Sequence, residues 1–441
     1  MNYQIIMTAR RRVGVVALTS ILGMLCSQRT LTAGEPGTGG TQQKVVVGRA
    51  ALLVGALLHR DNGAWRLLTP QADIYAEDLI VALPAGAINS KNRAVRLTLL
   101  SDLARVSPYP VLESAVILHD SPKDLDFTLE RGRVDVSNLK RSGEATVRIR
   151  FQKQVWDLTL GDRAKIAFEL FGRWPAGTNF SKTPKPDETP TLDMVMVVKE
   201  GQVNLKADGN EYAMHAPKGV AYYHWDSVPP HDEHPRFLEE LPGWTKLNAP
   251  PPAVAADLAN LIKIIVIKAR NQSSGSIEEA LASLLTEDSE TGRRIAVYGL
   301  GALDDLPTVI DALASSKFPD VRDIAVIALR HWIGRSEGQD IKLYDALIKK
   351  GYSERNAHRF VQLLHSFSDR QKGSPATYET LIELLQADNA AVRQLANWHL
   401  TRLVSKGADI KFDPLGTDAE RQSGIQKWKD LIPAGKLPPK A

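Results

Sequence analysis

Histidine and acidic side chains near the middle of the chain are the residue types best suited to metal binding. Residues 231–234 read His-Asp-Glu-His, and His215 and His224 precede them. A metal ion needs ligands held at fixed geometry with further hydrogen bonds behind them. Four adjacent residues in a proline-rich stretch cannot all face one ion, and the helical spacing His-Glu-x-x-His is absent. The pattern therefore predicts a solvated polar turn, and no metal site.

Acid–base or nucleophilic chemistry has even less support. Two carboxylates that hydrolyse a glycoside must face each other across a cleft, whereas Glu200 and Glu211 occupy hairpin positions that normally face solvent. There is no Gly-x-Ser-x-Gly elbow and no phosphate loop, and Gly299-Leu300-Gly301 follows a helical pattern, unlike a dinucleotide fingerprint. We therefore predict no catalytic residue and no cofactor, and expect a protein that is not an enzyme.

Aromatic residues form a cluster at the end of the first half of the chain. Residues 222–226 read Tyr-Tyr-His-Trp-Asp. Aromatic rings anchor interfaces and stack on sugars, but they also fill the ends of β sandwiches and barrels. Both interpretations stay open, and Tyr222, Tyr223 and Trp225 are candidate contacts for a ligand or partner.

Length and composition indicate a globular protein of two or three domains. The chain has 441 residues, of which 43% are hydrophobic and 24% charged, with 55 basic and 51 acidic side chains. These fractions are ordinary for a folded protein able to bury a large core. The basic residues form no stripe interleaved with aromatics, so we expect no nucleic-acid partner.

The N-terminal residues have the layout of a secretory signal peptide. Arg10, Arg11 and Arg12 precede an apolar run of 14 residues at 13–26, and small residues follow up to Ala33. Such a run is short for a membrane span, so we predict a signal at 1–33 and no transmembrane span in the mature chain. Cleavage of the signal, N-terminal anchoring and lipidation of Cys26 remain open. We expect export to the periplasm or cell envelope, followed by a flexible leader at 34–43.

Short apolar runs separated by Pro, Gly, Asn and Asp predict an all-β region at 44–227. Residues 44–58 are too interrupted by glycine to predict a strand or a helix. A template of apolar-x-x-Gly-x-Val-x-apolar occurs around Gly132 and again around Gly201. It predicts two hairpins with a tight glycine turn. We interpret the repeat as a duplicated β unit, with copies at 44–140 and 141–227.

The second copy resembles the β-domain of FecR-type regulators. The resemblance lies in a Gly-Thr-x-Phe turn at residues 177–180, a Val-x-x-Gly-x-Val segment at 198–203 and a glycine-containing turn at 216–219. It implies an extracytoplasmic sandwich or β-roll that contacts protein or envelope glycan. FecR regulators also have a cytoplasmic segment before a membrane span, but only nine residues precede the arginines here. Sigma-factor regulation is therefore not carried over.

Proline and then helical periodicity mark the second half of the chain. Residues 228–256 contain seven prolines and predict a semi-rigid linker. From 257 to 404 the spacing Arg-x-x-Ala-x-x-x-Leu recurs, and helix pairs repeating in this way predict an α-solenoid. The three copies are Arg293-Ala296-Leu300, Arg322-Ala325-Leu329 and Arg393-Ala396-Leu400.

The turns before these helices resemble HEAT repeats. Residues 318–325 and 387–393 are similar to the Asp-x-x-Val-Arg-x-x-Ala turn of that family, which implies stacked helix pairs with a concave binding face. Arg330, Trp332 and Arg359 are the candidate lining residues. A capping box from Thr417 to Glu420 predicts a last helix within a terminal region at 405–441.

The expected fold is thus an all-β, FecR-like domain followed by a HEAT-like α-solenoid. We expect a non-enzymatic binding or scaffold protein of the cell envelope with a protein partner, and any link to signalling is open. The alternative is a protein that binds carbohydrate or cell wall through the aromatic cluster.

Overall fold

The computed structural model describes most of the chain after residue 43. The described residues are 44–51, 56–61, 63–83, 86–101, 113–185, 188–228, 234–246, 252–271, 276–407, 409–432 and 436–439. The predicted signal peptide and leader, with Cys26, lie outside them. None of the described helices is long and apolar enough to cross a membrane.

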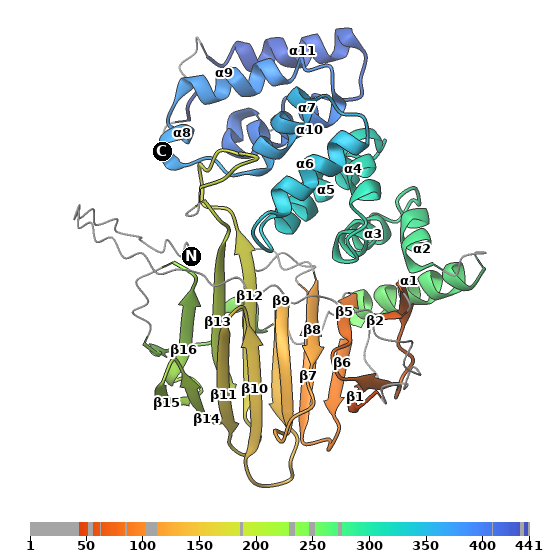
Figure 1. The fold of residues 1–441 in the computed structure, drawn as a ribbon. Coiled ribbons are helices and arrows are strands. Elements are labelled where there is room, and N and C mark those ends of the chain that lie inside the picture. The colour runs from red at the N-terminus through yellow and green to blue at the C-terminus, as the bar shows by residue number, and fades with distance from the viewer. Residues whose placement is uncertain are drawn as a thin grey trace, which may run out of the picture. The chain divides into compact units, whose positions relative to one another are not determined.

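Strands come first and helices second, as the sequence predicts (Figure 1). The strands of the described residues are β1 (Val46–Ala51), β2 (Ala56–Asp61), β3 (Ala64–Leu67), β4 (Asp73–Tyr75), β5 (Leu79–Leu83), β6 (Gly86–Ser90), β7 (Val95–Leu100), β8 (Ser114–Leu118), β9 (Leu125–Asn138), β10 (Ala145–Phe151), β11 (Gln154–Leu160), β12 (Lys165–Arg173), β13 (Thr191–Glu200), β14 (Gln202–Ala207), β15 (Asn210–His215), β16 (Gly219–Asp226) and β17 (Arg236–Leu238).

The strands form two mostly antiparallel sheets that share β9. Sheet A has the order β4-β1-β6-β7-β9-β12-β13-β16-β17. Sheet B has the order β3-β2-β5-β8-β9-β10-β11-β14-β15, in which β9 and β10 run parallel. One apolar core contains buried side chains of both sheets, among them Phe127, Trp156, Phe168 and Met196.

Side-chain alternation explains which strands are covered on one face and which on two. In β10, apolar and polar residues alternate, and every second one is buried, as in a strand with one face toward the core. In β5, four consecutive residues are buried. Ile80 and Ala82 belong to the core between the sheets, whereas Val81 and Leu83 belong to a second core that contains the helices. A continuous apolar run thus reflects burial of both faces.

The two glycine hairpins predicted around Gly132 and Gly201 are wrong. Gly132 lies inside β9, which pairs with β8 and β10 before this point and with β7 and β12 after it. Gly201 separates β13 from β14, and these two strands pair with other partners in different sheets. Both glycines have positive φ, of 101° and 74°. The glycines therefore redirect the chain from one sheet to the other, a change that L side chains strongly disfavour.

Residues 44–58 contain the strand β1 and the start of β2, which the sequence did not predict. Both strands are set by pairing, since β1 lies between β4 and β6 and β2 lies between β3 and β5. The predicted linker also contains regular structure. It holds β17 and a short 3-10 helix at Gly243–Lys246, and the first α-helix begins at Pro252.

The α-helices of the described residues are α1 (Pro252–Asn271), α2 (Ile277–Leu284), α3 (Glu290–Ala302), α4 (Leu306–Ser315), α5 (Pro319–Ile333), α6 (Gln339–Lys349), α7 (Glu354–Leu364), α8 (Asp369–Lys372), α9 (Pro375–Leu384), α10 (Ala390–Leu403) and α11 (Asp418–Lys429). The predicted capping box of Thr417 and Glu420 starts α11. Trp428 of α11 is fully buried. The helices α6 and α8 were not predicted.

The three repeated arginines occupy equivalent positions in α3, α5 and α10. Arg293 donates to the carbonyl of Glu287 at 2.7 Å, Arg322 to that of Ser316 at 2.7 Å, and Arg393 to that of Ala387 at 2.6 Å. Each arginine therefore reaches back six residues to the turn before its own helix. The spacing found in the sequence corresponds to one local structure used three times, in which a guanidinium fixes the entry into a helix.

Residues 44–441 form one compact unit in which strands and helices share a core. Leu58, Trp65 and Val81 of sheet B belong to the same apolar cluster as the helices. At a second contact, Gly172 of β12 lies against Gly334, the residue that ends α5. A Cβ added at Gly334 would lie 2.5 Å from the Gly172 carbonyl oxygen. Here two main chains touch without side chains between them.

Candidate functional site

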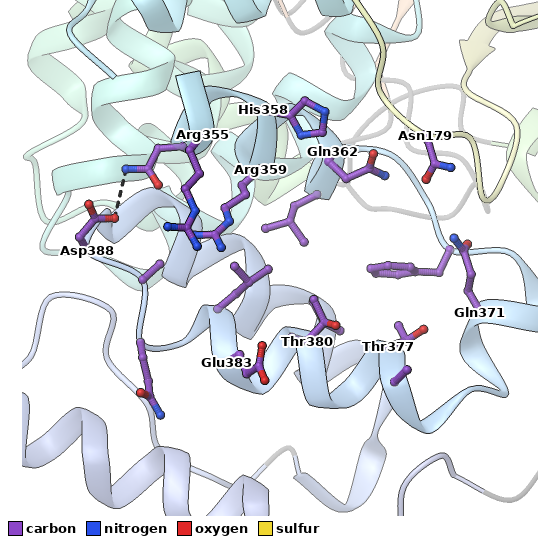
Figure 2. Close-up of a pocket in the computed structure, with 18 of the residues that line it drawn as sticks. Asn179, Arg355, His358, Arg359, Gln362, Gln371, Thr377, Thr380, Glu383 and Asp388 are labelled. Atoms are coloured by element: carbon purple, nitrogen blue, oxygen red, sulfur yellow. Dashed lines mark hydrogen bonds between the residues drawn. The ribbon is translucent and has the colours of Figure 1, made fainter. Parts of the chain in front are cut away.

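A cavity of about 770 Å³ lies between α7 and α9 (Figure 2). Its floor contains the apolar side chains of Leu363, Phe367, Leu381 and Leu384, and its rim is polar. Its volume falls in the range of ligand sites. We call this cavity the α7–α9 groove.

The α7 wall of the groove carries three long polar side chains on one helix face. Arg355, Arg359 and Gln362 line the cavity at positions i, i+4 and i+7, which lie above one another on a helix. Ser353 caps the helix by accepting the Asn356 N–H. The opposite face of α7 is apolar, with Phe360 and Val361 fully buried. Packing of that face turns the arginines toward the groove.

The two arginines lack an acidic partner within the described part of the chain. Figure 2 shows Arg355 and Arg359 extending side by side into the cavity. Neither makes an ion pair or a side-chain hydrogen bond with a described residue. The acidic residues of the groove are Glu383 on the α9 wall and Asp388, which accepts from Asn356 Nδ2 at 3.1 Å. Adjacent guanidinium groups with free donors suit a carboxylate or another planar anion.

The α9 wall is lined by smaller polar groups. Thr377, Thr380 and Glu383 lie at positions i, i+3 and i+6 of the helix and face the cavity. Pro375 occupies the first turn of α9, where its missing N–H costs nothing. One wall therefore presents cationic donors, and the other presents hydroxyl groups and one carboxylate.

The loop between β12 and β13 closes one end of the groove. Phe180 N–H donates to Gln362 Oε1 at 2.8 Å, and Gln362 Nε2 donates to the Thr178 carbonyl at 3.4 Å. The Phe180 ring packs between Tyr344 and His358, at centroid distances of 5.6 and 5.4 Å. The Gly-Thr-x-Phe stretch predicted as a turn of the β-domain is thus inserted into the helices.

The aromatic candidates lie mainly inside the sandwich. Tyr223 and Trp225 are only 2% and 5% exposed, on the face of β16 that points toward sheet B. The ring of Trp225 meets Phe151 at 5.2 Å, and that of Tyr223 meets Trp156 at 5.2 Å. Tyr222 points to the other face of sheet A and is half-buried, and burial raises the pKa of its hydroxyl. The three residues therefore do not form one surface.

Of the helical candidates, only Arg359 lines the groove. Arg330 donates to the Leu364 carbonyl at 2.7 Å and to Ser366 Oγ at 2.7 Å, so it binds the C-terminal end of α7. Its burial lowers its pKa to about 10. Trp332 is buried and donates to Asp304 at 2.8 Å. Arg355, Gln362 and Glu383 were not predicted, although the i, i+4, i+7 spacing along α7 groups the first two with Arg359.

A second cluster of charges lies where strands meet helices. Arg131 of β9 donates to Glu113 at 2.7 Å, and Arg335 also donates to this carboxylate. Burial favours the protonated acid, but the charges of Arg335, His331 and Arg131 outweigh it and lower the pKa of Glu113 to about 2. Arg131 and Arg335 also donate to the carbonyls that end α3, at Ala302 and Gly301. These bonds join the strands to the helices.

The histidine and carboxylate patterns do not form a site in the described structure. No group of three or more metal-ligating side chains occurs among the described residues, and residues 231–233 lie outside them. His224 contacts Asp193 at 3.1 Å. Glu200 pairs with Lys165 at 3.0 Å and Glu211 with Lys206 at 3.3 Å, so both carboxylates belong to exposed ion pairs between strands.

Comparison with known proteins adds no family to this description. No family model matches the chain, and no curated protein matches it. The resemblances to FecR-type β-domains and to HEAT repeats therefore stay predictions.

Proposed function

We propose that the chain is a non-enzymatic binding protein of the periplasm or cell envelope, and that it holds a protein partner in the α7–α9 groove. The observation that carries this proposal is the pair of arginines, Arg355 and Arg359, which face an open cavity without an acidic partner among the described residues. Charged donors kept side by side on a rigid helix cost electrostatic repulsion, and a bound anion relieves that repulsion.

The β part supports this role as a rigid base. Its loop at residues 177–180 fixes Gln362 and the adjacent end of α7, and Arg330 fixes the carbonyls at the same helix end. Binding sites whose side chains are held by a second set of contacts lose less entropy on binding. Carbohydrate binding through the aromatic cluster has less support, because the rings of Tyr223 and Trp225 are buried.

A variant that fills the groove tests the proposal. Thr380 is exposed on the α9 wall, so Thr380→Trp adds bulk to the cavity without changing the charge. We expect the tagged full chain to retain a protein from an envelope extract, and Thr380→Trp to lose it. The control is Thr291→Trp, at an exposed position of α3 away from the groove.

The proposal fails if Thr380→Trp unfolds at the same urea concentration as the wild type and still retains the same proteins. It also fails if only wall glycan is retained, and by both variants equally.

A further inference from the structure

The chain shows how one end of the groove receives a peptide main chain. The Gln362 amide accepts from the N–H of Phe180 and donates to the carbonyl of Thr178. These two main-chain groups lie two residues apart and meet the same amide, and residues 178–180 are in neither a helix, a turn nor a bend. A side-chain amide that pairs with an N–H and a carbonyl of the main chain holds the segment by its backbone. Such binding does not depend on the side chains of the segment.

The same face of α7 continues from Gln362 to the two arginines. A helix rises 1.5 Å per residue, so Arg359 and Arg355 lie about 4.5 and 10.5 Å further along its axis. An extended chain advances about 3.3 Å per residue. The stretch of α7 between Gln362 and Arg355 therefore has the length of about three residues of an extended segment.

The charges of the two walls determine which side chains a bound segment can carry. Arg355 and Arg359 attract acidic side chains on the α7 side. Glu383 faces them from α9, and it disfavours a segment with acidic residues on both sides. A segment with Asp or Glu on one side and neutral or donor groups on the other satisfies both walls.

We infer that the groove binds an extended segment of a partner protein. The acidic side chains of this segment contact Arg355 and Arg359, on the part of α7 beyond the contact of Gln362 with Thr178 and Phe180. This inference rests on the proposed function and names the chemistry of the partner. The segment lies along α7, with its main chain over the apolar floor of Leu381 and Leu384 and its acidic residues toward the two guanidinium groups.

A peptide library displayed against the full chain tests the inference. The probes are random 12-residue linear peptides, and each selected peptide is remade with Asn and Gln in place of Asp and Glu. We expect the selected peptides to be acidic, and the amide versions to bind about tenfold or more weakly, since charge-assisted hydrogen bonds are lost. The double variant Arg355→Ala/Arg359→Ala should show the same loss toward the acidic peptides.

The matched control removes two positive charges outside the groove. Lys342 and Lys349 are exposed on α6 and do not line the cavity. Lys342→Ala/Lys349→Ala should bind the acidic peptides as the wild type does, and this separates local recognition from the overall charge of the protein.

Each other outcome overturns the inference in a recognisable way. Equal affinity for acidic and amide peptides, together with loss in Thr380→Trp, would leave the groove as a binding site but remove the acidic ligand. Selected peptides that bind the Arg355→Ala/Arg359→Ala variant with the affinity of the wild type would also remove the acidic ligand. A protein partner that depends on Thr380, without binding of any linear peptide, would replace the extended segment by a folded surface.

Discussion

Glu113 is ionised although its side chain is only 1% exposed, and this depends on its neighbours. Arg131 and Arg335 both donate to it. Burial lowers the pKa of His331 to about 4, against the opposing effect of Glu113, so this imidazole is neutral at pH 7. The two arginines therefore compensate the carboxylate near neutral pH. Each arginine also donates to a carbonyl at the end of α3. Glu113 therefore fixes two side chains that connect the strands to the helices.

We predict that Glu113→Gln destabilises the protein by about 3 kcal/mol, because it removes the buried carboxylate shared by Arg131 and Arg335, of which Arg335 keeps a second acid, Asp304 at 2.9 Å. Urea unfolding followed by tryptophan fluorescence measures the change. The control is Glu337→Gln, at an exposed position two residues beyond Arg335, which should unfold like the wild type. Equal midpoints for the two variants would mean that the cluster contributes no net stability.

Single residues of the groove could be predicted only in part. Arg359 was a candidate because a solenoid offers a concave face, and it does line the cavity. Arg330 and Trp332 were candidates for the same reason, but both are used in packing. Arg330 binds the end of α7, and Trp332 donates to Asp304. Whether an arginine binds a ligand or a carbonyl depends on the neighbouring helix, and its spacing along its own helix does not contain that information.

Among the elements, β12 and α5 approach each other closely. Gly172 and Gly334 face each other, and a side chain on either would collide with the backbone of the other. The same strand end continues into Trp174, which stacks on His365 at 4.7 Å and donates to the Ile333 carbonyl at 3.1 Å. The helices are thus attached to β12 through both main chain and side chain.

We predict that Gly334→Ala destabilises the chain by about 1–3 kcal/mol, the range for overpacked contacts. The φ of Gly334 is −83°, which alanine adopts easily, so the effect comes from the collision with Gly172. Gly373→Ala is the matched control, because this glycine also ends a helix, with φ of −82°, and an added Cβ has no atom closer than 3.5 Å. Thermal unfolding of both variants measures the difference, and a similar Tm for the two would contradict this account.

Helices with a local pattern could be predicted. The helices α3, α5 and α10 and the capping box of α11 were found from spacing and end signals within a few residues. The sheet change at Gly132 could not, because the same local template fits a hairpin and a strand that passes between sheets. The insertion of Phe180 depends on Gln362, 182 residues away in the chain. No local pattern encodes such a contact.

At the scale of the whole molecule, three buried histidines make stability depend on pH. Burial lowers the pKa of His331 and His365 to about 4 and that of His399 to about 3, from an ordinary value of 6.5. The unfolded chain therefore binds protons before the folded chain does. Their contribution to stability is complete above pH 6.5 and is lost as the pH falls through 6.5 toward 4.

We predict that the urea midpoint falls steadily between pH 6.5 and pH 4, and that His399→Gln reduces this slope. Glutamine can still donate to the Leu363 carbonyl, to which His399 Nε2 lies at 2.5 Å, but it does not titrate. The control is His215→Gln, since His215 is exposed on β15. An acid dependence that is the same in wild type and His399→Gln would show that this histidine does not take part.

The shared core of strands and helices has a consequence for how the protein is made. Leu58, Trp65, Val81 and Leu83 are covered by helices that the ribosome adds much later. While the chain is being synthesised, a finished sandwich would therefore present a wide apolar face to its surroundings, and such faces associate with other nascent chains. The strand half by itself should therefore be a poor product of expression.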